Sequence, residues 1–226
     1  ALFALTAAYP SGTCEACFEW ELYRAQFLFA QISTLEDSLQ HLLTFETTLE
    51  QLRARYPRTF QRGRTHLQQG EANLRMGYFD DALMEFARAE ALLGDSDEGD
   101  VARLQKAMCA FYGGDIPWAK TQLEVLLQST SKSIANDALE NALMISANSV
   151  EDTLMEGLQL IREPMLLEAQ GKTAAAIEKY KALKNILIVH ELYDDVCLKL
   201  GKLYLDSTQW EAALAEFMLV QKAAGE

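Results

Sequence analysis

Residues 70–89 read GEANLRMGYFDDALMEFARA, and small and apolar side chains recur in this stretch at ordered steps. Gly70, Gly77, Ala82, Phe86 and Ala89 are separated by seven, five, four and three positions. Steps of four and three keep side chains on one face of an α-helix. A glycine between two such segments can adopt the backbone conformation that ends one helix and starts the next. The stretch therefore predicts two helices joined by a short turn at Gly77.

The same spacing occurs three more times along the chain. The corresponding residues are Ala107, Gly114, Ala119, Leu123 and Leu126, then Pro164, Gly171, Ala176, Tyr180 and Leu183, then Gly201, Thr208, Ala213, Phe217 and Val220. The second set begins 37 residues after the first, and the fourth begins 37 residues after the third. A helix pair of this size cannot bury its own apolar faces, so neighbouring pairs must stack. We therefore expect an all-α fold, an α-solenoid of antiparallel helix pairs.

These motifs resemble the tetratricopeptide repeat family, most clearly at residues 70–82 and 201–213. The resemblance covers most of residues 62–224 and implies a superhelix that mediates protein–protein interaction. Residues 111–119 and 129–139 are also similar to a stretch of large repeat proteins from Bacteroidetes and related bacteria. That likeness implies a helical-repeat architecture and a bacterial source, and it implies no particular activity.

Caps and helix breakers predict about eleven helices and no strand. We expect helices at about 13–31, 35–55, 60–76, 79–93, 100–113, 116–128, 131–147, 150–170, 173–189, 193–206 and 209–224. Asp115 is expected to cap one helix, with Pro117 in its first turn. We expect one solenoid over residues 1–226, made of a divergent repeat at 1–61, two regular repeats at 62–128, an inserted helix at 129–150 and two repeats at 151–226.

Two irregularities interrupt the repeat. The second and third matching sets begin 57 residues apart, which leaves room for one extra helix near 131–147. An odd helix upsets the alternation of a solenoid, so we expect a change of superhelical direction, or a helix across the stack, around 128–153. Pro164 lies inside a helical pattern and predicts a bend near Ile161, with a break there as the alternative.

The N-terminal part follows a looser pattern. Tyr9-Pro10 and Tyr56-Pro57 each end an apolar helical run, as expected where proline stops the second helix of a repeat. The chain also begins with Ala1 and not with Met. We therefore expect the solenoid to have extended further toward the N-terminus.

Composition excludes several classes of partner. The 226 residues are 50% apolar and carry a formal net charge of −13, which repels nucleic acid and anionic membranes over most of the surface. No apolar stretch is long enough for a membrane helix; residues 1–9 are short and have no basic flank. We expect protein partners, no nucleic acid and no transmembrane segment.

No constellation of residues predicts catalysis, a metal or a cofactor. His41 and His66 lie in different predicted helices, and His190 lies beyond the end of a third, 173–189. Counted from Asp95, the acidic run has Asp100 and Lys106 where a calcium loop needs glycine and glutamate, and no Gly-Lys-Ser or Gly-Lys-Thr follows Gly113-Gly114 as a phosphate loop requires. We expect a protein that is not an enzyme, and no cofactor.

The cysteines leave the compartment open. Cys14 and Cys17 are interpreted either as buried helix thiols or as a reversible disulfide, and no second pair completes a zinc site. The resemblance to bacterial repeat proteins favours the periplasm or cell envelope, with the cytoplasm as the alternative.

The expected function is that of a scaffold or adaptor in a bacterial multiprotein assembly, which binds protein on the concave face. Candidate lining residues lie on one side of the first helix of each pair: Leu67, Glu71, Leu104, Met108, Phe111, Tyr112, Ile161, Met165, Leu198 and Lys202. Their steps of four and three suit a helical core equally well. Leu67 and Glu71 stand where a clamp for a C-terminal carboxylate is expected, so a basic or apolar segment is the better ligand. The alternative is a structural subunit that self-associates as a homo-oligomer, or stacks on the rest of its own chain.

Overall fold

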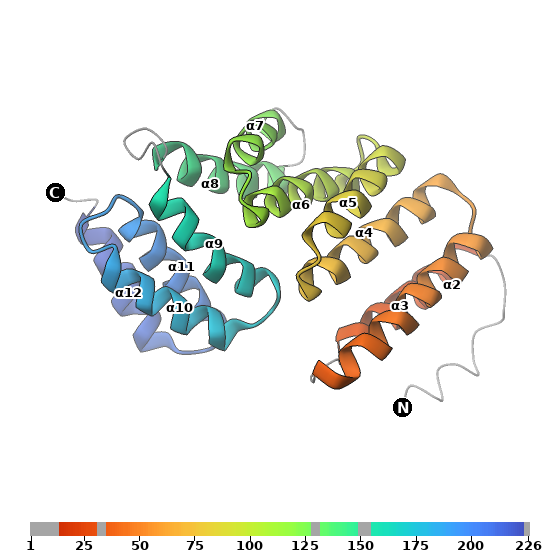
Figure 1. The fold of residues 1–226 in the computed structure, drawn as a ribbon, viewed down its shortest axis with the longest axis horizontal. Helices are drawn as coiled ribbons and strands as arrows, with labels where there is room; N and C mark the ends of the chain where they lie inside the picture. Colours follow the sequence, from red (N-terminus) through yellow and green to blue (C-terminus); the bar gives the residue numbers. More distant parts are fainter. Residues whose placement is uncertain (1–13, 31–34, 128–131, 149–154, 224–226) are drawn as a thin grey trace. The chain divides into compact units, whose positions relative to one another are not determined.

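The computed structural model describes residues 14–30, 35–127, 132–148 and 155–223 (Figure 1). In these ranges the chain is helical, without a strand. The helices are α2 Glu15–Ala30, α3 Leu35–Arg55, α4 Thr59–Met76, α5 Phe79–Leu93, α6 Asp97–Gly113, α7 Ile116–Leu126, α8 Lys132–Ala147, α9 Glu156–Ala169, α10 Thr173–Ile186, α11 Leu192–Asp206 and α12 Trp210–Ala223. Helices that follow one another pack in pairs, so the expected all-α arrangement of helix pairs is confirmed.

The chain divides into two compact units, residues 1–106 and 107–226. In the first unit, α3 packs against both α2 and α4, and α4 packs against α5. In the second unit, α7 packs on α8, and α9 to α12 pack in series. Helix α8 is the extra helix expected near 131–147.

Most helix boundaries follow the expected ranges. Helix α6 begins at Asp97, earlier than expected, because the Ser96 hydroxyl accepts a hydrogen bond from the Gly99 N–H and serves as the cap. The Asp115 carboxylate accepts from the Trp118 N–H, as expected. The Tyr9-Pro10 turn falls on residues outside the described ranges, as do both ends of the region 128–153, where a change of direction is expected.

Pro164 does not break its helix. Helix α9 continues through Pro164 to Ala169, so the alternative of a break near Ile161 is wrong. The bend stays a prediction. A separate finding is that none of the described helices is long and apolar enough to cross a membrane.

The second residue of each matching set forms the turn between two helices. Gly77, Gly114, Gly171 and Thr208 all have a left-handed backbone, with φ of 83°, 103°, 72° and 59°. At the first of these turns the Tyr78 N–H donates to the Asn73 carbonyl at 2.9 Å, which closes the end of α4. The turn that the sequence predicts at Gly77 is confirmed.

In the first and fourth sets the first residue is glycine, and an aromatic ring packs on it. A Cβ atom on Gly70 would lie 2.6 Å from the Phe86 ring, and one on Gly201 would lie 2.5 Å from the Phe217 ring. In the second set alanine replaces the glycine at 107 and leucine replaces the ring at 123. The third set has Pro164 and Tyr180 at these positions, so the absence of a side chain explains the close packing only at Gly70 and Gly201.

We expect Thr208→Gly to raise the free energy of unfolding by about 1 kcal/mol, because a β-branched residue is strained at positive φ and glycine is not. Ser207→Gly is the matched control, since Ser207 has φ of −86° and gains nothing from glycine. Urea denaturation of both variants checks this; equal or opposite shifts would contradict it.

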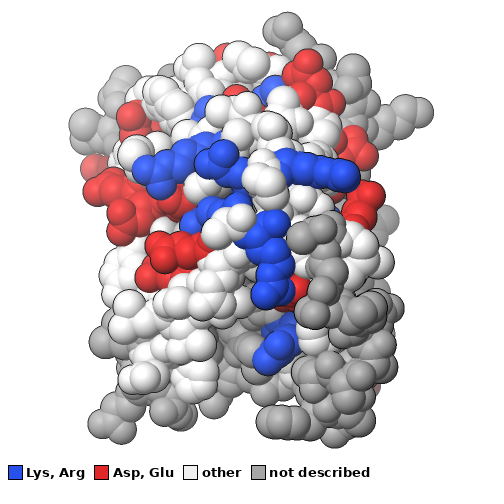
Figure 2. Space-filling model, turned by 90° about the vertical axis from the view of Figure 1, so that its right-hand side faces the viewer, with Lys and Arg blue, Asp and Glu red and all other residues white. Residues whose placement is uncertain are grey.

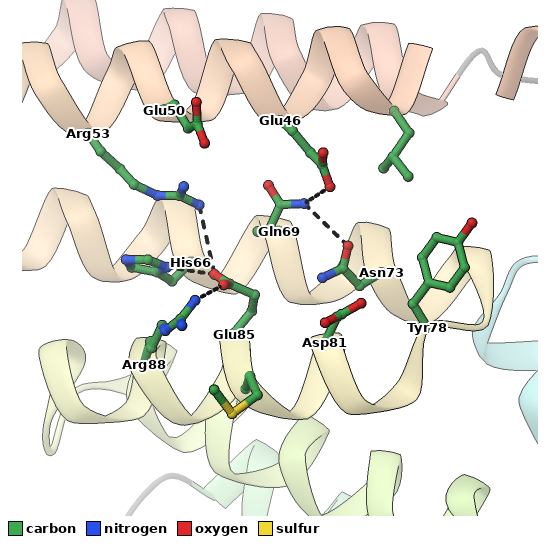
Figure 3. Close-up of a pocket in the computed structure, with 12 residues that line it drawn as sticks. Glu46, Glu50, Arg53, His66, Gln69, Asn73, Tyr78, Asp81, Glu85 and Arg88 are labelled. Atoms are coloured by element: carbon green, nitrogen blue, oxygen red, sulfur yellow. Dashed lines mark hydrogen bonds and ion pairs between the residues drawn. The ribbon is translucent and has the colours of Figure 1, made fainter. Parts of the chain in front are cut away.

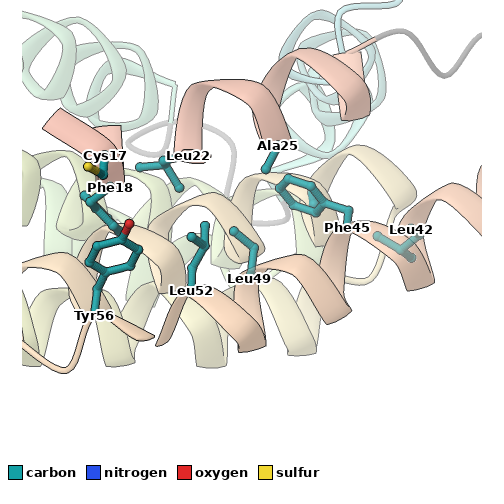
Figure 4. Close-up of a cluster of buried hydrophobic side chains, with 10 residues drawn as sticks. Cys17, Phe18, Leu22, Ala25, Leu42, Phe45, Leu49, Leu52 and Tyr56 are labelled. Atoms are coloured by element: carbon teal, nitrogen blue, oxygen red, sulfur yellow. The ribbon is translucent and has the colours of Figure 1, made fainter. Parts of the chain in front are cut away.

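A buried apolar cluster holds α2 against α3 (Figure 4). Its members are Cys17, Phe18, Leu22, Ala25, Leu42, Phe45, Leu49, Leu52, Tyr56 and Ala72. The rings of Phe18 and Tyr56 meet edge to face, with centroids 5.3 Å apart. Because one face of α3 is fixed by this cluster, a neighbouring face of the same helix is left to line the groove described next.

Candidate binding groove

Most of the expected concave residues are in the core. Leu67, Leu104, Met108, Phe111, Tyr112, Ile161 and Met165 are buried. Glu71 and Leu198 are partly exposed, and Lys202 is exposed with its Nζ 2.9 Å from the Glu140 carboxylate. The apolar steps of four and three along these helices therefore mark packing faces, and the buried side chains do not form a surface that a partner could contact.

Among the expected concave residues, Glu71 has a carboxyl group whose pKa is shifted. Burial raises the pKa of Glu71, against the effects of Arg75 and of a hydrogen bond from Gln68. Glu71 is itself a carboxyl group, so this position supplies no basic side chain to a ligand carboxylate.

A polar cavity of about 560 Å³ lies in the first unit, between α3, α4 and α5 (Figure 3). Its lining residues are Leu42, Glu46, Glu50, Arg53, His66, Gln69, Asn73, Tyr78, Asp81, Met84, Glu85 and Arg88. Each helix contributes side chains at steps of three and four, so one face of each is turned to the cavity. We call this cavity and its lining the groove.

Two buried amides lie in the middle of the groove. The Gln69 Nε2 donates to Glu46 Oε1 at 3.0 Å and to Asn73 Oδ1 at 3.3 Å (Figure 3). Gln69 and Asn73 are both buried. Each side-chain amide has donor and acceptor groups, as a peptide bond has. The two side chains are thus held in place by neighbours and suit hydrogen bonding to a polypeptide backbone.

A charged cluster closes one end of the groove around Glu85. The His66 Nδ1 lies 2.6 Å from Glu85 Oε2, and Arg88 also pairs with this carboxylate. Arg53 reaches it more distantly, at 3.9 Å, and its Nε donates to the Thr65 hydroxyl at 3.1 Å. Burial acts to raise the pKa of Glu85, but the hydrogen bond from His66 and the charges of Arg88 and Arg53 outweigh it, so the pKa lies below its ordinary value.

We expect Glu85→Gln to lower the free energy of unfolding at pH 7 by about 1–3 kcal/mol, because it replaces one acceptor oxygen by an N–H donor and removes the negative charge that faces Arg88 and Arg53. Since the Glu85 pKa is lowered in the folded state, its stabilisation is present above the ordinary glutamate pKa and is lost as the pH falls through the lowered value. The difference between variant and wild type should therefore shrink below about pH 4.

Urea denaturation over a pH series measures this difference. The matched control is Glu163→Gln, which removes an exposed ion pair with Lys179 and should cost less than about 0.5 kcal/mol at every pH. A Glu85→Gln deficit that stays constant down to low pH would contradict the prediction.

Arginines gather where α3 ends and α4 begins. Residues 53–64 hold five of them, Arg53, Arg55, Arg58, Arg62 and Arg64. Arg55 bonds both oxygens of Glu21 at 2.8 and 3.0 Å, and Arg64 pairs with Glu19. Figure 2, which looks onto the side where α2 and α3 lie, shows Lys and Arg side chains in a branching band with acidic side chains on both sides. The net charge of −13 thus conceals a locally basic surface.

The groove was not predicted from the sequence, although a signal for it exists. His66, Gln69 and Asn73 are polar residues at helical steps in a helix whose apolar residues already account for one face. Such a stripe is usually solvated. Here α3 and α5 cover it, and only the packing of three helices shows this.

The cysteines do not form a metal site in the described part of the chain. Cys14 and Cys17 form a disulfide at the start of α2, which agrees with the second of the two interpretations above. Burial raises the pKa of Cys109 to about 12 and that of Cys197 to about 11. Among the described residues no group of three or more His, Cys, Asp and Glu side chains is arranged to hold a metal ion.

Comparison with known proteins adds no family to these observations. No protein-family model matches the sequence, and no curated protein matches it either.

Proposed function

We propose that this chain is a tetratricopeptide-type adaptor that binds a polypeptide segment of another protein in the groove and catalyses no reaction. The observation that carries the proposal is the polar cavity, lined from three consecutive helices, with two buried and oriented amides in its middle. A bacterial source and a place in a multiprotein assembly are supported by the sequence motifs of the repeats.

The size and chemistry of the groove favour an extended segment. From His66 to Asn73 the axis of α4 rises about 10 Å, which matches about three residues of extended chain. Buried amides satisfy backbone groups of a ligand, while the charged side chains at the rim select its side chains. A small ligand would leave part of this cavity filled with water.

A second candidate function is self-association, which the last helix favours. Trp210, Leu214 and Met218 of α12 are exposed at steps of four, so they share one face of the helix. Light scattering tests this candidate. An oligomer that persists on dilution and that Leu214→Ser converts to a monomer would favour it, whereas a stable monomer favours the adaptor.

We expect Asp81→Asn to weaken binding of the native partner at least tenfold, because Asp81 lines the groove and the substitution removes its carboxylate. Asp80→Asn is the matched control: both residues are exposed, carry the same charge and stand in the first turn of α5, but Asp80 does not line the groove. The partner is first identified by co-purification from the cells that naturally make the protein. Its affinity for each purified variant is then measured by calorimetry, and equal affinities for the two variants would contradict the proposal.

A further inference from the structure

We infer that the groove recognises a segment carrying one acidic and one basic residue about three positions apart. The acidic residue faces Arg53 and Arg88, and the basic residue faces Glu46 and Asp81 (Figure 3). This inference rests on the proposed function, since it specifies the polypeptide that the groove binds.

Along each of the three helices, the groove residues at one end stand seven positions from those at the other end. Along α3 seven residues separate Glu46 from Arg53, and along α5 seven residues separate Asp81 from Arg88. Seven helical residues span about 10 Å, and three extended residues span about the same length. In Figure 3, Arg53 and Arg88 lie on the side of His66, whereas Glu46 and Asp81 lie on the side of Asn73. The ends therefore differ in charge across the length of a short peptide.

The end of the groove at His66 holds both guanidinium groups that line it, those of Arg53 and Arg88. Glu85 pairs with Arg88 and lies 3.9 Å from Arg53, and Glu50 also acts on Arg53, so two carboxylates stand against the two guanidinium groups. Burial is the main cause that lowers the pKa of Arg53, and the charges of Arg88 and Arg62 lower it further. The charges of Glu85 and Glu50 act in the opposite direction. Half of the Arg88 side chain is exposed, so it can turn toward a ligand carboxylate.

The acidic end has carboxylates and no basic side chain among the residues that line it. Glu46 accepts one hydrogen bond from Gln69, which leaves its other oxygen available as an acceptor, and Asp81 is exposed on the opposite wall. Tyr78 beside them offers an aromatic face on which a lysine or arginine can lie. Glu50 lies beside Arg53, at the other end of the groove (Figure 3).

Recognition of a mixed segment can be distinguished from general attraction of a basic peptide to an acidic protein. A chain of net charge −13 attracts a peptide with two lysines most strongly if only long-range charge matters. A groove with guanidinium groups at one end and none at the other binds the mixed peptide best, because the second lysine of a two-lysine peptide would face Arg53 and Arg88. Like charges held close together at a protein surface repel by several kcal/mol before salt screening.

Fluorescence anisotropy with the full chain at low ionic strength tests this directly. The probes are four fluorescein-labelled nonapeptides with blocked ends and identical Ser/Ala backgrounds, carrying glutamate and lysine three positions apart, two lysines, two glutamates, or two glutamines at those positions. We expect the mixed peptide to bind at least tenfold tighter than each of the others. Tightest binding by the two-lysine peptide, or no binding by any of the four, would overturn the inference.

Variants of the exposed groove residues assign each end. Asp81→Asn should remove the contribution of the lysine and leave that of the glutamate, Arg88→Gln should do the reverse, and Asp80→Asn should change neither. If the two-lysine peptide binds best and depends on Asp81, the proposed function stands and the charge pattern is wrong. If no peptide binds and the native partner is indifferent to Asp81→Asn, the proposed function itself fails.

Discussion

Phe86→Ala is expected to lower the free energy of unfolding by about 3–5 kcal/mol, the range for removing a buried aromatic side chain. Phe86 is fully buried in α5, and its ring lies directly on Gly70 of α4. Because Gly70 has no side chain that could fill the space, the loss of the ring leaves a cavity between the two helices of the repeat. The matching residues of the other sets predict that this contact is what joins the helices of each pair.

The control is Met84→Ala in the same helix. Met84 is 53% exposed, so its truncation should change stability by less than about 1 kcal/mol. Chemical denaturation followed by circular dichroism measures both variants. Similar losses for Phe86→Ala and Met84→Ala would show that α4 and α5 are not held together in this way.

Gly99→Ala is expected to lower the free energy of unfolding by about 3 kcal/mol, at the upper end of the cost of overpacking. A Cβ atom at this position would overlap the Gly94 carbonyl oxygen, which is backbone and cannot move aside by changing a rotamer. The same carbonyl accepts a hydrogen bond from Arg103 Nη2 at 3.1 Å, so displacing it also disturbs the contact between the α5–α6 turn and α6.

Gly113→Ala is expected to have the opposite effect on stability, although Gly113 lies in the same helix. A Cβ atom on Gly113 meets nothing within 4 Å, so alanine should stabilise α6 by about 0.5–1 kcal/mol through its higher helix propensity. Thermal denaturation of the two alanine variants provides the comparison. A Gly99→Ala protein as stable as wild type would mean that the α5–α6 turn does not pack on α6 as described.

The helices and their turns could be predicted because local rules determine them. The steps between Gly70, Gly77, Ala82 and Phe86 reflect a close crossing, a left-handed turn and one packed helix face, and each has its expected place. Thr208 occupies the same turn position although threonine does not favour a positive φ. The turn is therefore set by the packing around it and not by glycine alone.

The groove could not be predicted because its residues come from three helices, one of which lies outside the matching sets. Glu46 and Arg53 belong to α3, where the repeat pattern is weak. On α4, Asn73 was not recognised because a polar residue next to an apolar stripe is usually solvated. Conversely, Phe111 and Ile161 were candidates for a surface since their spacing is helical, yet that spacing serves the core.

Position-specific photo-crosslinking tests most directly whether the groove binds a polypeptide. A benzoylphenylalanine side chain replaces Tyr78, an exposed aromatic residue of the groove, or Trp210 on α12 as the control, in cells that naturally make the protein. We predict one discrete crosslinked polypeptide at position 78 that is absent at position 210 and is lost when Asp81→Asn is added. The same crosslinks from both positions, or crosslinks at position 78 that persist with Asp81→Asn, would contradict binding in the groove.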